Sequence, residues 1–537
     1  MPFQQHVLSE QIALDPHISQ LLTDLKEPDV IDAQWLMQLG KDALEEKKTS
    51  IELMNAGLNA REKQRIPTSL SFSDVAVILS YVFPWRSIEI AAGDTILGCY
   101  LNDDDHKGLY IVDVKELGKI VDSVAPTYNT RTITDVLEKI ERIAPTVQQT
   151  SDPNLTIVNN GIYDRTERKL IPFSPDYVFT SKIATDFVAD PKPVLLTAPD
   201  GYVWDVDTWI SELAEDEDTQ TLLWQVIADF IQSGITRNKS IWFYSQAGNN
   251  GKGTFGQLIK NLVGRQNYAS LSVEQFSHEF YKANLIGVVG VIGDENNTDK
   301  YIDSVPDFKA AVSGDDLMIN RKYAAPINYQ FKGSIIQMIN ALPKTKDKTD
   351  SFYRRLILVP FLKSFTNNGE RTYIKNEYIY NQKVLEYVLH KALVLPDFTE
   401  FIVPEKSKEA LSEYKELNNP VIQFWNELSD SFEWDLLPTQ FLYDLFVAWY
   451  KRNNPNGKVS NKKSFSDSLS LYLENNTEWK PSFQTAQRSV GRMDSDEELI
   501  STYRLIDWTD TSYTGTSLTR MRKFNRAVSY RGVLRRT

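Results

Sequence analysis

A glycine- and asparagine-rich loop that ends in a lysine is the part of this sequence best suited to chemistry. The segment Ile241 to Phe255 reads IWFYSQAGNNGKGTF. Its pattern predicts a buried strand over Ile241 to Tyr244, then the loop, then a helix from Thr254 to Leu262. Glycines let the backbone N–H groups of such a loop point inward, and the helix N-terminus adds partial positive charge. This order predicts a phosphate-binding loop in which Lys252 reaches the β- and γ-phosphates of a nucleotide.

The loop departs from the common phosphate-loop pattern G-x-x-x-x-G-K-[ST] at two positions. Gln246 stands where the pattern has glycine, and Gly253 stands where it has serine or threonine. That missing hydroxyl normally binds Mg²⁺, and the nearest replacement, on Thr254, is rotated by about 100° on a helix. Taken alone, the loop fits either a nucleotide site or an ordinary strand-to-helix turn. The residues expected to contact a nucleotide are Gly248, Asn249, Asn250, Gly251, Lys252, Gly253, Thr254 and Phe255.

A pair of acids follows the next strongly hydrophobic segment. Leu285 to Asn296 reads LIGVVGVIGDEN, which predicts a buried strand that ends in Asp294 and Glu295. An aspartate at a strand end can hold phosphate-bound Mg²⁺, directly or through water, and the adjacent carboxylate can deprotonate the attacking water. Acids at strand ends are common, so it is their position after the lysine loop that favours these roles.

Two further polar groups belong to later strands. Gly333 to Asn340 predicts a buried strand next to the acidic one, and its terminal amide could contact the γ-phosphate or the attacking water. The alternative is a turn or cap asparagine. Arg354 and Arg355 open a fourth strand, and an arginine there could reach a phosphate bound by a neighbouring subunit. The alternative for the arginines is a surface salt bridge.

The predicted elements around these groups alternate between strand and helix. Before the loop, Asp218 to Ile235 has the apolar spacing of an amphipathic helix, with Gly234 near its end. Between the acids and the asparagine, Ile319 to Phe331 is predicted as a hairpin of two short strands. Such alternation is typical of an α/β domain with a parallel sheet.

The flanking regions have a different character. Residues 1–150 predict a mixed α/β region, in which Leu101 to Gly108 (LNDDDHKG) could mimic a polymerase metal site. No second acidic or histidine motif follows at a suitable distance, so a polar hairpin turn is predicted there. Residues 415–537 predict two helices with a short turn and then strands, which favours a winged-helix module over a helical cap.

The basic residues near the C-terminus form a separate candidate site. Thr511 to Thr537 contains no acidic residue, and we interpret it either as a phosphate-binding arm or as a disordered solubilising end. Its basic residues are Arg520, Arg522, Lys523, Arg526, Arg531, Arg535 and Arg536.

Bulk composition narrows the functional class. A chain of 537 residues predicts several domains, and a net charge of −13 argues against coating nucleic acid with the whole surface. The single cysteine, Cys99, excludes an internal disulfide and a cysteine-based zinc site. No apolar run is long enough for a bilayer, and the first residues lack the pattern of a signal peptide. We therefore expect a cytoplasmic protein without a membrane partner.

Taken in order, these motifs resemble the superfamily 3 helicases, which are AAA+ motors of small viruses, phages and mobile elements. The resemblance covers roughly residues 155–365, and its most specific part is the spacing of GDD, RKY and QMIN before SFYRRLILVPF. The segment NNGIYDRTERKLIPFSPDYVFTSKIATDF is similar to the region before the motor in the phage- and poxvirus-type primase–helicase branch. The motifs that carry the resemblance are AGNNGKGT (247–254), VIGDEN (291–296), FKAAVSGDDLMINRKYAAPINY (308–329) and IIQMIN (335–340).

The resemblance implies a fold and a set of ligands. It implies an AAA+ P-loop motor with a central parallel sheet in residues 236–400, preceded by strands and a helical collar in residues 151–235. ATP and Mg²⁺ are the implied cofactors, and the motor is expected to form a ring, such as a hexamer. Asp294 and Thr254 are the expected metal ligands, whereas Glu295, Asn340, Arg354 and Arg355 are the expected catalytic groups.

The family also places a basic residue at the tip of a hairpin, where it touches single-stranded DNA in a central pore. By position that residue is Lys322, with Tyr323 beside it and Arg321 in support. A lysine there can contact backbone phosphates, and a tyrosine can pack on sugar or base. The alternative is a solvated turn.

The function implied is an ATP-dependent DNA helicase that initiates replication of a bacterial mobile element, of the staphylococcal cassette or pathogenicity-island kind. Its partners would be single-stranded DNA, duplex origin DNA and a separately encoded primase or polymerase. One alternative is a DNA-binding initiator or scaffold that uses ATP only for assembly, which Gly253 favours. A protein remodeller fits poorly with the basic pair Arg321 and Lys322, and a primase–helicase fusion needs carboxylates not found before residue 150.

Overall fold

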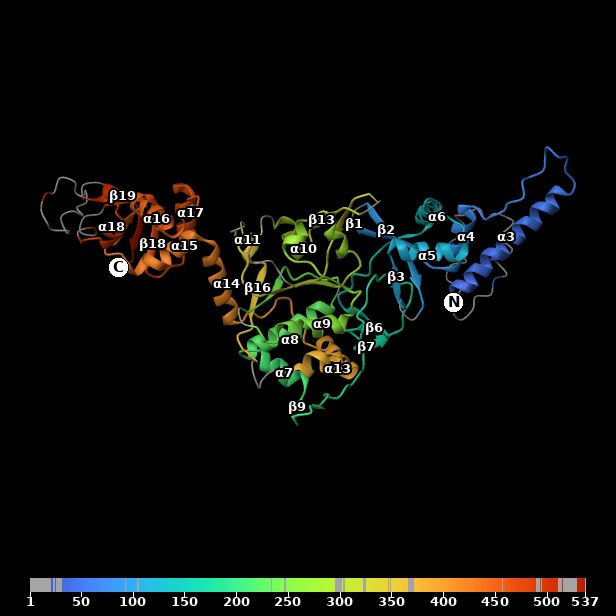
Figure 1. The fold of residues 1–537 in the computed structure, drawn as a ribbon, viewed down its shortest axis with the longest axis horizontal. Helices are drawn as coiled ribbons and strands as arrows, with labels where there is room; N and C mark the ends of the chain where they lie inside the picture. Colours follow the sequence, from blue (N-terminus) through green and yellow to red (C-terminus); the bar gives the residue numbers. More distant parts are fainter. Residues whose placement is uncertain are drawn as a thin grey trace. The chain divides into compact units, whose positions relative to one another are not determined.

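The computed structural model separates the chain into two compact units, Met1–Ala410 and Leu411–Thr537, each considered by itself (Figure 1). Within the described part of the chain, no helix is both long enough and apolar enough to cross a membrane. The structure describes residues 21–22, 25, 31–91, 93–103, 106–232, 234–245, 248–294, 302, 305–321, 325–345, 347, 349–365, 371–455, 457–488, 493, 495–509, 514 and 529–536.

The first unit begins with a four-stranded sheet of order β3-β2-β1-β4, packed against helices. Helix α4 forms because Ser71 and Asp74 make a reciprocal capping box at its start, which resolves an ambiguous strand-or-helix pattern in the sequence. As predicted, a polar turn follows β2, since Asp103 accepts a bond from the His106 backbone and β2 pairs antiparallel with β3. The elements are α3 (Ala33–Asn55), α4 (Phe72–Val82), β1 (Trp85–Ala91), β2 (Asp94–Leu101), β3 (Leu109–Ile111), α5 (Val114–Val124), α6 (Thr130–Ile143) and β4 (Thr146–Gln148).

Short strands and two helices lead into the central sheet. The predicted helix before the loop is confirmed as α8 (Glu217–Ile231), but its amphipathic character is wrong, because Leu222 to Ile231 are buried without interruption. Helix α8 packs against the sheet and against helices α9 and α13, so little of its later surface meets water. The elements are β5 (Leu155–Val158), β6 (Gly161–Asp164), β7 (Lys169–Ile171), β8 (Leu196–Thr197), β9 (Val203–Trp204) and α7 (Val206–Leu213).

A five-stranded parallel sheet of order β11-β12-β15-β10-β16 forms the centre of the unit. Helices α9 and α10 lie on opposite sides of this sheet (Figure 1). Phe243 packs against Phe255 of α9, whereas its neighbour Trp242 packs against Phe308 of α10. The elements are β10 (Ser240–Tyr244), α9 (Lys252–Val263), β11 (Tyr268–Ala269), β12 (Gly290–Gly293), α10 (Pro306–Ser313), β15 (Ser334–Ile339), α11 (Asp350–Tyr353), β16 (Leu356–Pro360), α12 (Thr372–Asn376) and α13 (Gln382–Leu393).

The predicted hairpin is confirmed, although its first strand ends at Ile319, where the prediction had it begin. The predicted acidic strand is shorter than expected. Strands β13 (Asp316–Ile319) and β14 (Ile327–Gln330) pair antiparallel. The strand predicted from Leu285 onward is regular only in β12, because Gly287 has a left-handed φ of 76° and residues Tyr281–Leu285 form a 3₁₀ helix. A left-handed residue interrupts an extended strand.

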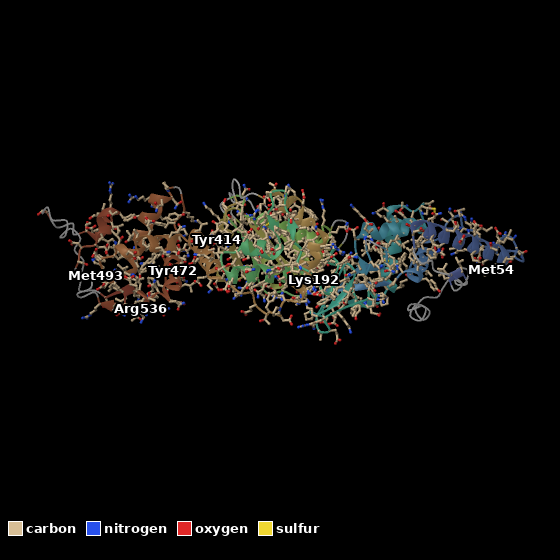
Figure 2. All side chains as sticks on the ribbon, turned by 90° about the horizontal axis from the view of Figure 1, so that it is seen from below. Met54, Lys192, Tyr414, Tyr472, Met493 and Arg536 are labelled. Atoms are coloured by element: carbon tan, nitrogen blue, oxygen red, sulfur yellow. The ribbon has the colours of Figure 1, made fainter. Side chains whose placement is uncertain are left out.

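The second unit packs helices against a three-stranded antiparallel sheet of order β17-β19-β18. Its core is rich in aromatic rings, such as Phe424, Phe446 and Phe465, and Figure 2 shows the dense side chains around Tyr472. Both predicted helices are confirmed as α16 and α17. The elements are α14 (Glu405–Asn418), α15 (Pro420–Leu428), β17 (Leu436–Pro438), α16 (Thr439–Asn453), α17 (Lys462–Leu473), β18 (Trp479–Arg488), α18 (Glu498–Thr502) and β19 (Ser529–Arg535).

The last residues of the basic segment are not a free end. Strand β19 is the middle strand of this sheet, and Arg535 pairs with Asp435 and Glu478 and stacks on Trp479. The expectation of a loose arm is therefore wrong for Ser529–Arg535, because its backbone bonds complete the sheet. The basic residues Arg520, Arg522, Lys523 and Arg526 lie outside the described residues.

Candidate nucleotide-binding site

Lys252 lies where the carboxyl ends of two neighbouring strands meet. Its Nζ donates to the Ile339 carbonyl (2.5 Å) and to Asn340 Oδ1 (2.7 Å). The contact arises because β10 and β15 run parallel and adjacent, so the loop after one strand meets the residue after the other. The structure thus brings together the lysine and the asparagine that the sequence singled out.

The loop takes a shape that depends on residues able to adopt left-handed backbone angles. Gly251 caps α9 with a φ of 81°, and Asn249 has a φ of 53°. A Cβ at Gly251 would lie 2.4 Å from a terminal methyl of Leu213, and the left-handed φ would strain other residues, so glycine is strongly favoured there. The Asn250 side chain accepts from the Lys252 backbone at 3.1 Å, and the Phe365 backbone donates to the Asn249 carbonyl at 2.7 Å.

The buried positive charge of Lys252 is only partly balanced by the half-exposed carboxylate of Asp294. Lys252 is 7% exposed, and burial lowers the pKa of its ammonium group, while the nearby Asp294 carboxylate acts in the opposite direction. Asp294 follows β12, is half-exposed and also lies 3.6 Å from Lys260. A buried cation at a helix N-terminus favours an incoming anion. Phosphate groups are therefore the ligands that this arrangement suits.

These groups share one cavity of about 480 Å³. Every loop residue from Gly248 to Thr254 lines it, together with Asp294 and Asn340. Phe255 does not; its ring is fully buried against Phe243 and Trp209, because the first turn of α9 directs it toward the sheet. The expectation that Phe255 contacts the nucleotide is therefore corrected to a role in the core.

The cavity also has a wall that the sequence analysis missed. Residues after β16 contribute it, including Arg371 and Lys375 of the α12 region. The Arg371 guanidinium stacks 3.4 Å from the centre of the Tyr202 ring and pairs with Glu212. No sequence motif identifies the segment after β16 as part of a site. Its basic residues, Arg371 and Lys375, are the feature that could have indicated a phosphate site.

Gly253 stands where a phosphate loop usually has a serine or threonine, and the space beside it is unfilled. A Cβ at Gly253 would meet no atom within 4 Å, so packing does not require glycine there. Thr254 lines the cavity with Asp294, and a hydroxyl and a carboxylate are suitable oxygen donors for Mg²⁺. The described residues include no group of three or more metal-ligating side chains, so phosphates and water would have to complete a metal's coordination here.

Arg354 and Arg355 lie at the amino ends of the parallel strands, whereas the lysine loop lies at their carboxyl ends. They precede β16, which runs parallel to β10, so the strand length separates them from the lysine loop of the same chain. Arg355 bonds to Ser313 (2.9 Å) and to the Ser351 carbonyl (2.6 Å), whereas Arg354 is exposed. They also line a cavity of about 540 Å³ that includes Lys239.

Lys239 is a second group that the sequence analysis missed. Its Nζ donates to the Arg354 carbonyl at 2.5 Å and so fixes the backbone that carries the exposed arginine. Burial lowers the pKa of Lys239, with Glu400 acting against that shift. The one sequence feature that could have pointed to Lys239 is its place directly before β10, the strand that leads to the lysine loop.

Three expected site residues lie outside the described residues: Glu295, Lys322 and Tyr323. Arg321, which begins the hairpin loop, donates to the Ala325 carbonyl at 3.3 Å and 3.4 Å. It therefore links the two ends of the hairpin loop, and its role beside Lys322 stays a prediction.

Comparisons with protein families match three segments of the chain. The descriptions are "D5 N terminal like" for residues 86–232, "Family of unknown function (DUF5906)" for residues 243–355 and "Poxvirus D5 protein-like" for residues 416–509. The two D5 matches support a relationship of this chain to D5-type proteins. No curated protein sequence matches it.

Solved structures of the NrS-1 C-terminal region are similar over much of the chain. One, described as the A form apo structure, is 15% identical, with a TM-score of 0.40 over 76% of this chain and 86% of that chain. Another apo structure is 15% identical, with a TM-score of 0.41 over 72% of this chain and 94% of that one. The function must therefore be argued from the site.

Proposed function

We propose that this chain is an ATP-dependent DNA helicase. The observation that carries the proposal is the bond from Lys252 to Asn340 in a cavity that also contains Asp294. Strand β15 lies between the strand of the lysine loop and the strand of the acid, which is the order expected of an AAA+ motor. The D5-type matches agree with a role in replication.

Each group at the cavity has a defined task in this proposal. Lys252 and the loop N–H groups bind phosphates, and an incoming phosphate would replace the Ile339 carbonyl as a partner of the lysine. Asn340 senses the γ-phosphate, and Glu295 deprotonates the attacking water. Asp294 and Thr254 would hold Mg²⁺, which neutralises phosphate charge when bound.

The second half of the site comes from a neighbouring copy. Arg354 is exposed at the far edge of the sheet, so it can reach a phosphate only across an interface between subunits. A closed ring, such as a hexamer, repeats that interface around the motor. In the pore, Lys322 and Tyr323 would contact single-stranded DNA from the hairpin.

The second unit would bind duplex DNA at an origin. Its helices α15, α16 and α17, with a sheet of order β17-β19-β18 in which β17 precedes α16, fit a winged-helix module. Helix α17 would enter the major groove. The exposed Lys462 and Lys463 begin that helix. With a separately encoded primase or polymerase, such a protein would start replication of a mobile element.

The test is unwinding of a forked DNA, together with ATP turnover, by the wild type and two variants. Lys252→Ala should lose both ATP turnover and unwinding, because the buried cation that binds phosphate is gone. Lys322→Ala should lose unwinding and the stimulation of turnover by single-stranded DNA. Lys383→Ala, an exposed lysine on α13, is the control and should behave as wild type.

One alternative is favoured by a specific residue. Gly253 lacks the hydroxyl of active phosphate loops, so the site could serve assembly of a DNA-bound initiator or scaffold. Weak ATP turnover that Glu295→Gln leaves unchanged, with no unwinding by the wild type, would favour this alternative over the motor.

A further inference from the structure

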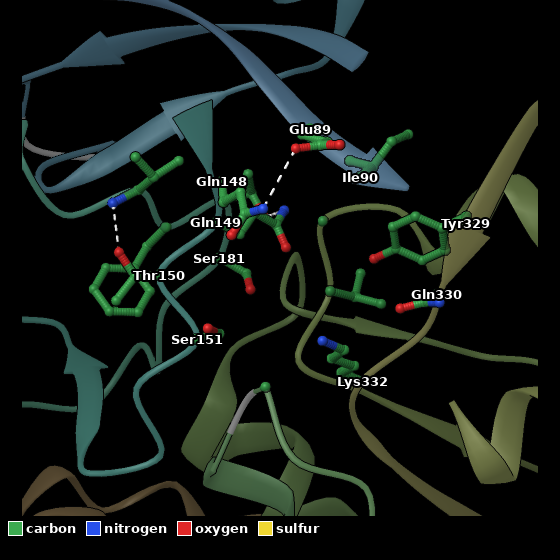
Figure 3. Close-up of a pocket in the computed structure, with 16 residues that line it drawn as sticks. Glu89, Ile90, Gln148, Gln149, Thr150, Ser151, Ser181, Tyr329, Gln330 and Lys332 are labelled. Atoms are coloured by element: carbon green, nitrogen blue, oxygen red, sulfur yellow. Dashed lines mark hydrogen bonds between the residues drawn. The ribbon is translucent and has the colours of Figure 1, made fainter. Parts of the chain in front are cut away.

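A second polar cavity lies at the foot of the β13–β14 hairpin and shares no residue with the nucleotide cavity. Its volume is about 330 Å³. Figure 3 shows that its walls come from the N-terminal sheet, with Glu89 and Gln148, and from β14, with Tyr329 and Gln330. The cavity therefore lies beside the element that the proposed function assigns to DNA.

The side chains around this cavity are those that recognise nucleobases. Gln148 and Gln149 each offer an amide donor and an amide acceptor. The Gln330 amide nitrogen already donates to Asp316 at 2.9 Å, so Gln330 offers its amide oxygen. The Gln148 amide bonds to Glu89, and the Gln149 amide bonds to Thr180, both at 3.5 Å. Bonds of this length are weak, so these amides can exchange them for the polar edge of a base.

The charge in the cavity suits one phosphate. Lys332 projects into the space in Figure 3, and Ser151 and Ser181 line the same cavity. Among the described residues Lys332 has no ion pair. The single charge of Lys332 matches one phosphodiester and is too small for a triphosphate. Glu89, on the facing wall, repels further phosphate charge.

The hairpin wall of the cavity is fixed in place. Asp94, at the start of β2, accepts a bond from the Asn328 backbone at 2.9 Å, which ties β14 to the N-terminal sheet. Tyr329 is buried, and its hydroxyl bonds to the Gly287 backbone. Burial raises the pKa of Tyr329 to about 12, so its hydroxyl stays protonated at neutral pH. A ligand would therefore meet preformed walls.

We infer that this cavity binds one nucleotide unit of single-stranded DNA. The glutamine amides and Glu89 would meet the base edge, and Lys332 with the nearby hydroxyls would hold the phosphate. The inference deepens the proposed function, on which it rests for the identity of the strand, by adding a DNA contact apart from the hairpin loop. The same chemistry would accept a free deoxynucleoside monophosphate.

Direct binding without ATP tests the inference. We would measure the fluorescence anisotropy of a short labelled single-stranded oligodeoxynucleotide with wild type, Lys332→Ala and Gln149→Leu. Each variant removes one phosphate or base contact, so its affinity should fall by about 5-fold or more. Lys383→Ala is the matched lysine control and should bind as wild type, and thermal unfolding of each variant checks that it is folded.

Competition and crosslinking locate the ligand. Free dAMP, dCMP, dGMP or TMP that displaces the oligonucleotide shows that the cavity also takes isolated nucleotides, and no displacement shows that it reads only a strand. An oligonucleotide with 5-iodouracil should crosslink to peptides that contain Gln148 to Ser151 or Tyr329 to Lys332. Loss of that crosslink in Gln149→Leu would support the assignment.

The inference is overturned if both variants bind the oligonucleotide as tightly as wild type, or if the wild type binds neither oligonucleotide nor mononucleotide. These outcomes are separate from the failure of the helicase proposal, because binding is measured without ATP. A wild type that hydrolyses no ATP, yet whose binding depends on Lys332 and Gln149, would refute the motor and retain the cavity.

Discussion

At the scale of single residues, the proposed nucleotide site has its lysine in place but lacks the usual hydroxyl of a metal ligand. Lys252 is buried and bonded to Asn340, which is the arrangement expected before a phosphate binds. Gly253 removes a hydroxyl from the next position, although the surrounding space would accept one. Gly253 therefore bears on how Mg²⁺ would be held, whereas the phosphate contacts would come from Lys252 and the loop backbone.

Restoring the hydroxyl should strengthen the metal contact. We expect Gly253→Ser to lower the Mg²⁺ concentration for half-maximal ATP turnover by about 5-fold, which corresponds to one added polar contact. The substitution should fold, because a Cβ at this position meets no atom within 4 Å. A Mg²⁺ titration of ATP turnover measures the effect.

Gly253→Ala is the matched control for that experiment, because it adds the same Cβ and a better helix former without a hydroxyl. If serine and alanine give the same Mg²⁺ dependence, the gain comes from the helix, and another ligand already replaces the missing group.

At the scale of elements, the second unit contains a buried acid at a helix start. Glu497 is fully buried, caps α18, and accepts bonds from the backbone of Glu433 at 2.9 Å and Trp434 at 3.3 Å. Burial nonetheless raises the pKa of its carboxyl to about 7, since desolvation outweighs those bonds. We therefore expect the stability of the second unit to depend on pH through Glu497.

The sign of this effect follows from proton counts. Between the ordinary pKa of 4.5 and about 7, the folded unit binds more protons at Glu497 than the unfolded chain does. The free energy of unfolding of the second unit should thus fall as pH rises through this window, by on the order of 1–3 kcal/mol. Pulse proteolysis in urea, with peptides of residues 411–537 quantified by mass spectrometry, measures it.

Glu497→Gln should remove this pH dependence, because the side chain keeps an acceptor oxygen and cannot ionise. Glu474→Gln, at an exposed position of the same unit, is the control and should keep the wild-type slope. An unchanged slope in Glu497→Gln would assign the pH dependence to another group.

At the scale of the whole molecule, the two groups of the proposed catalytic site, the lysine loop and Arg354, lie at opposite ends of the strands of one parallel sheet. The lysine loop follows β10, and Arg354 precedes β16, its parallel neighbour. One chain cannot bring these groups together, so the proposed chemistry requires a second copy. Oligomer formation is thus a requirement of the proposed mechanism.

Mixing variants tests this requirement. Lys252→Ala and Arg354→Ala should each have little ATP turnover alone. Mixed in equal amounts, they should regain part of it, since roughly a quarter of the interfaces would pair an intact lysine loop with an intact arginine. Turnover of the mixture is the measurement, and a mixture as inactive as its components would show that Arg354 does not complete the site of a neighbouring copy.

Local patterns in the sequence were enough to predict the helices, the hairpin, the parallel strands and most residues of the lysine loop. Caps, apolar spacing and turn residues act over a few positions, so the sequence carries them directly. The same reasoning failed where a residue's surroundings come from distant segments. Phe255 looked like part of the loop but packs in the core, and the basic end supplies a central strand.

What only the tertiary structure decided is which distant segments lie side by side. Neighbouring strands β10 and β15 bring Lys252 to Asn340, and packing of β14 on the N-terminal sheet creates the polar cavity with Lys332. The sequence by itself determined the chemical groups and their order along the chain. Strand order and domain packing depend on contacts between segments far apart in the chain, and these contacts determined which groups share a site.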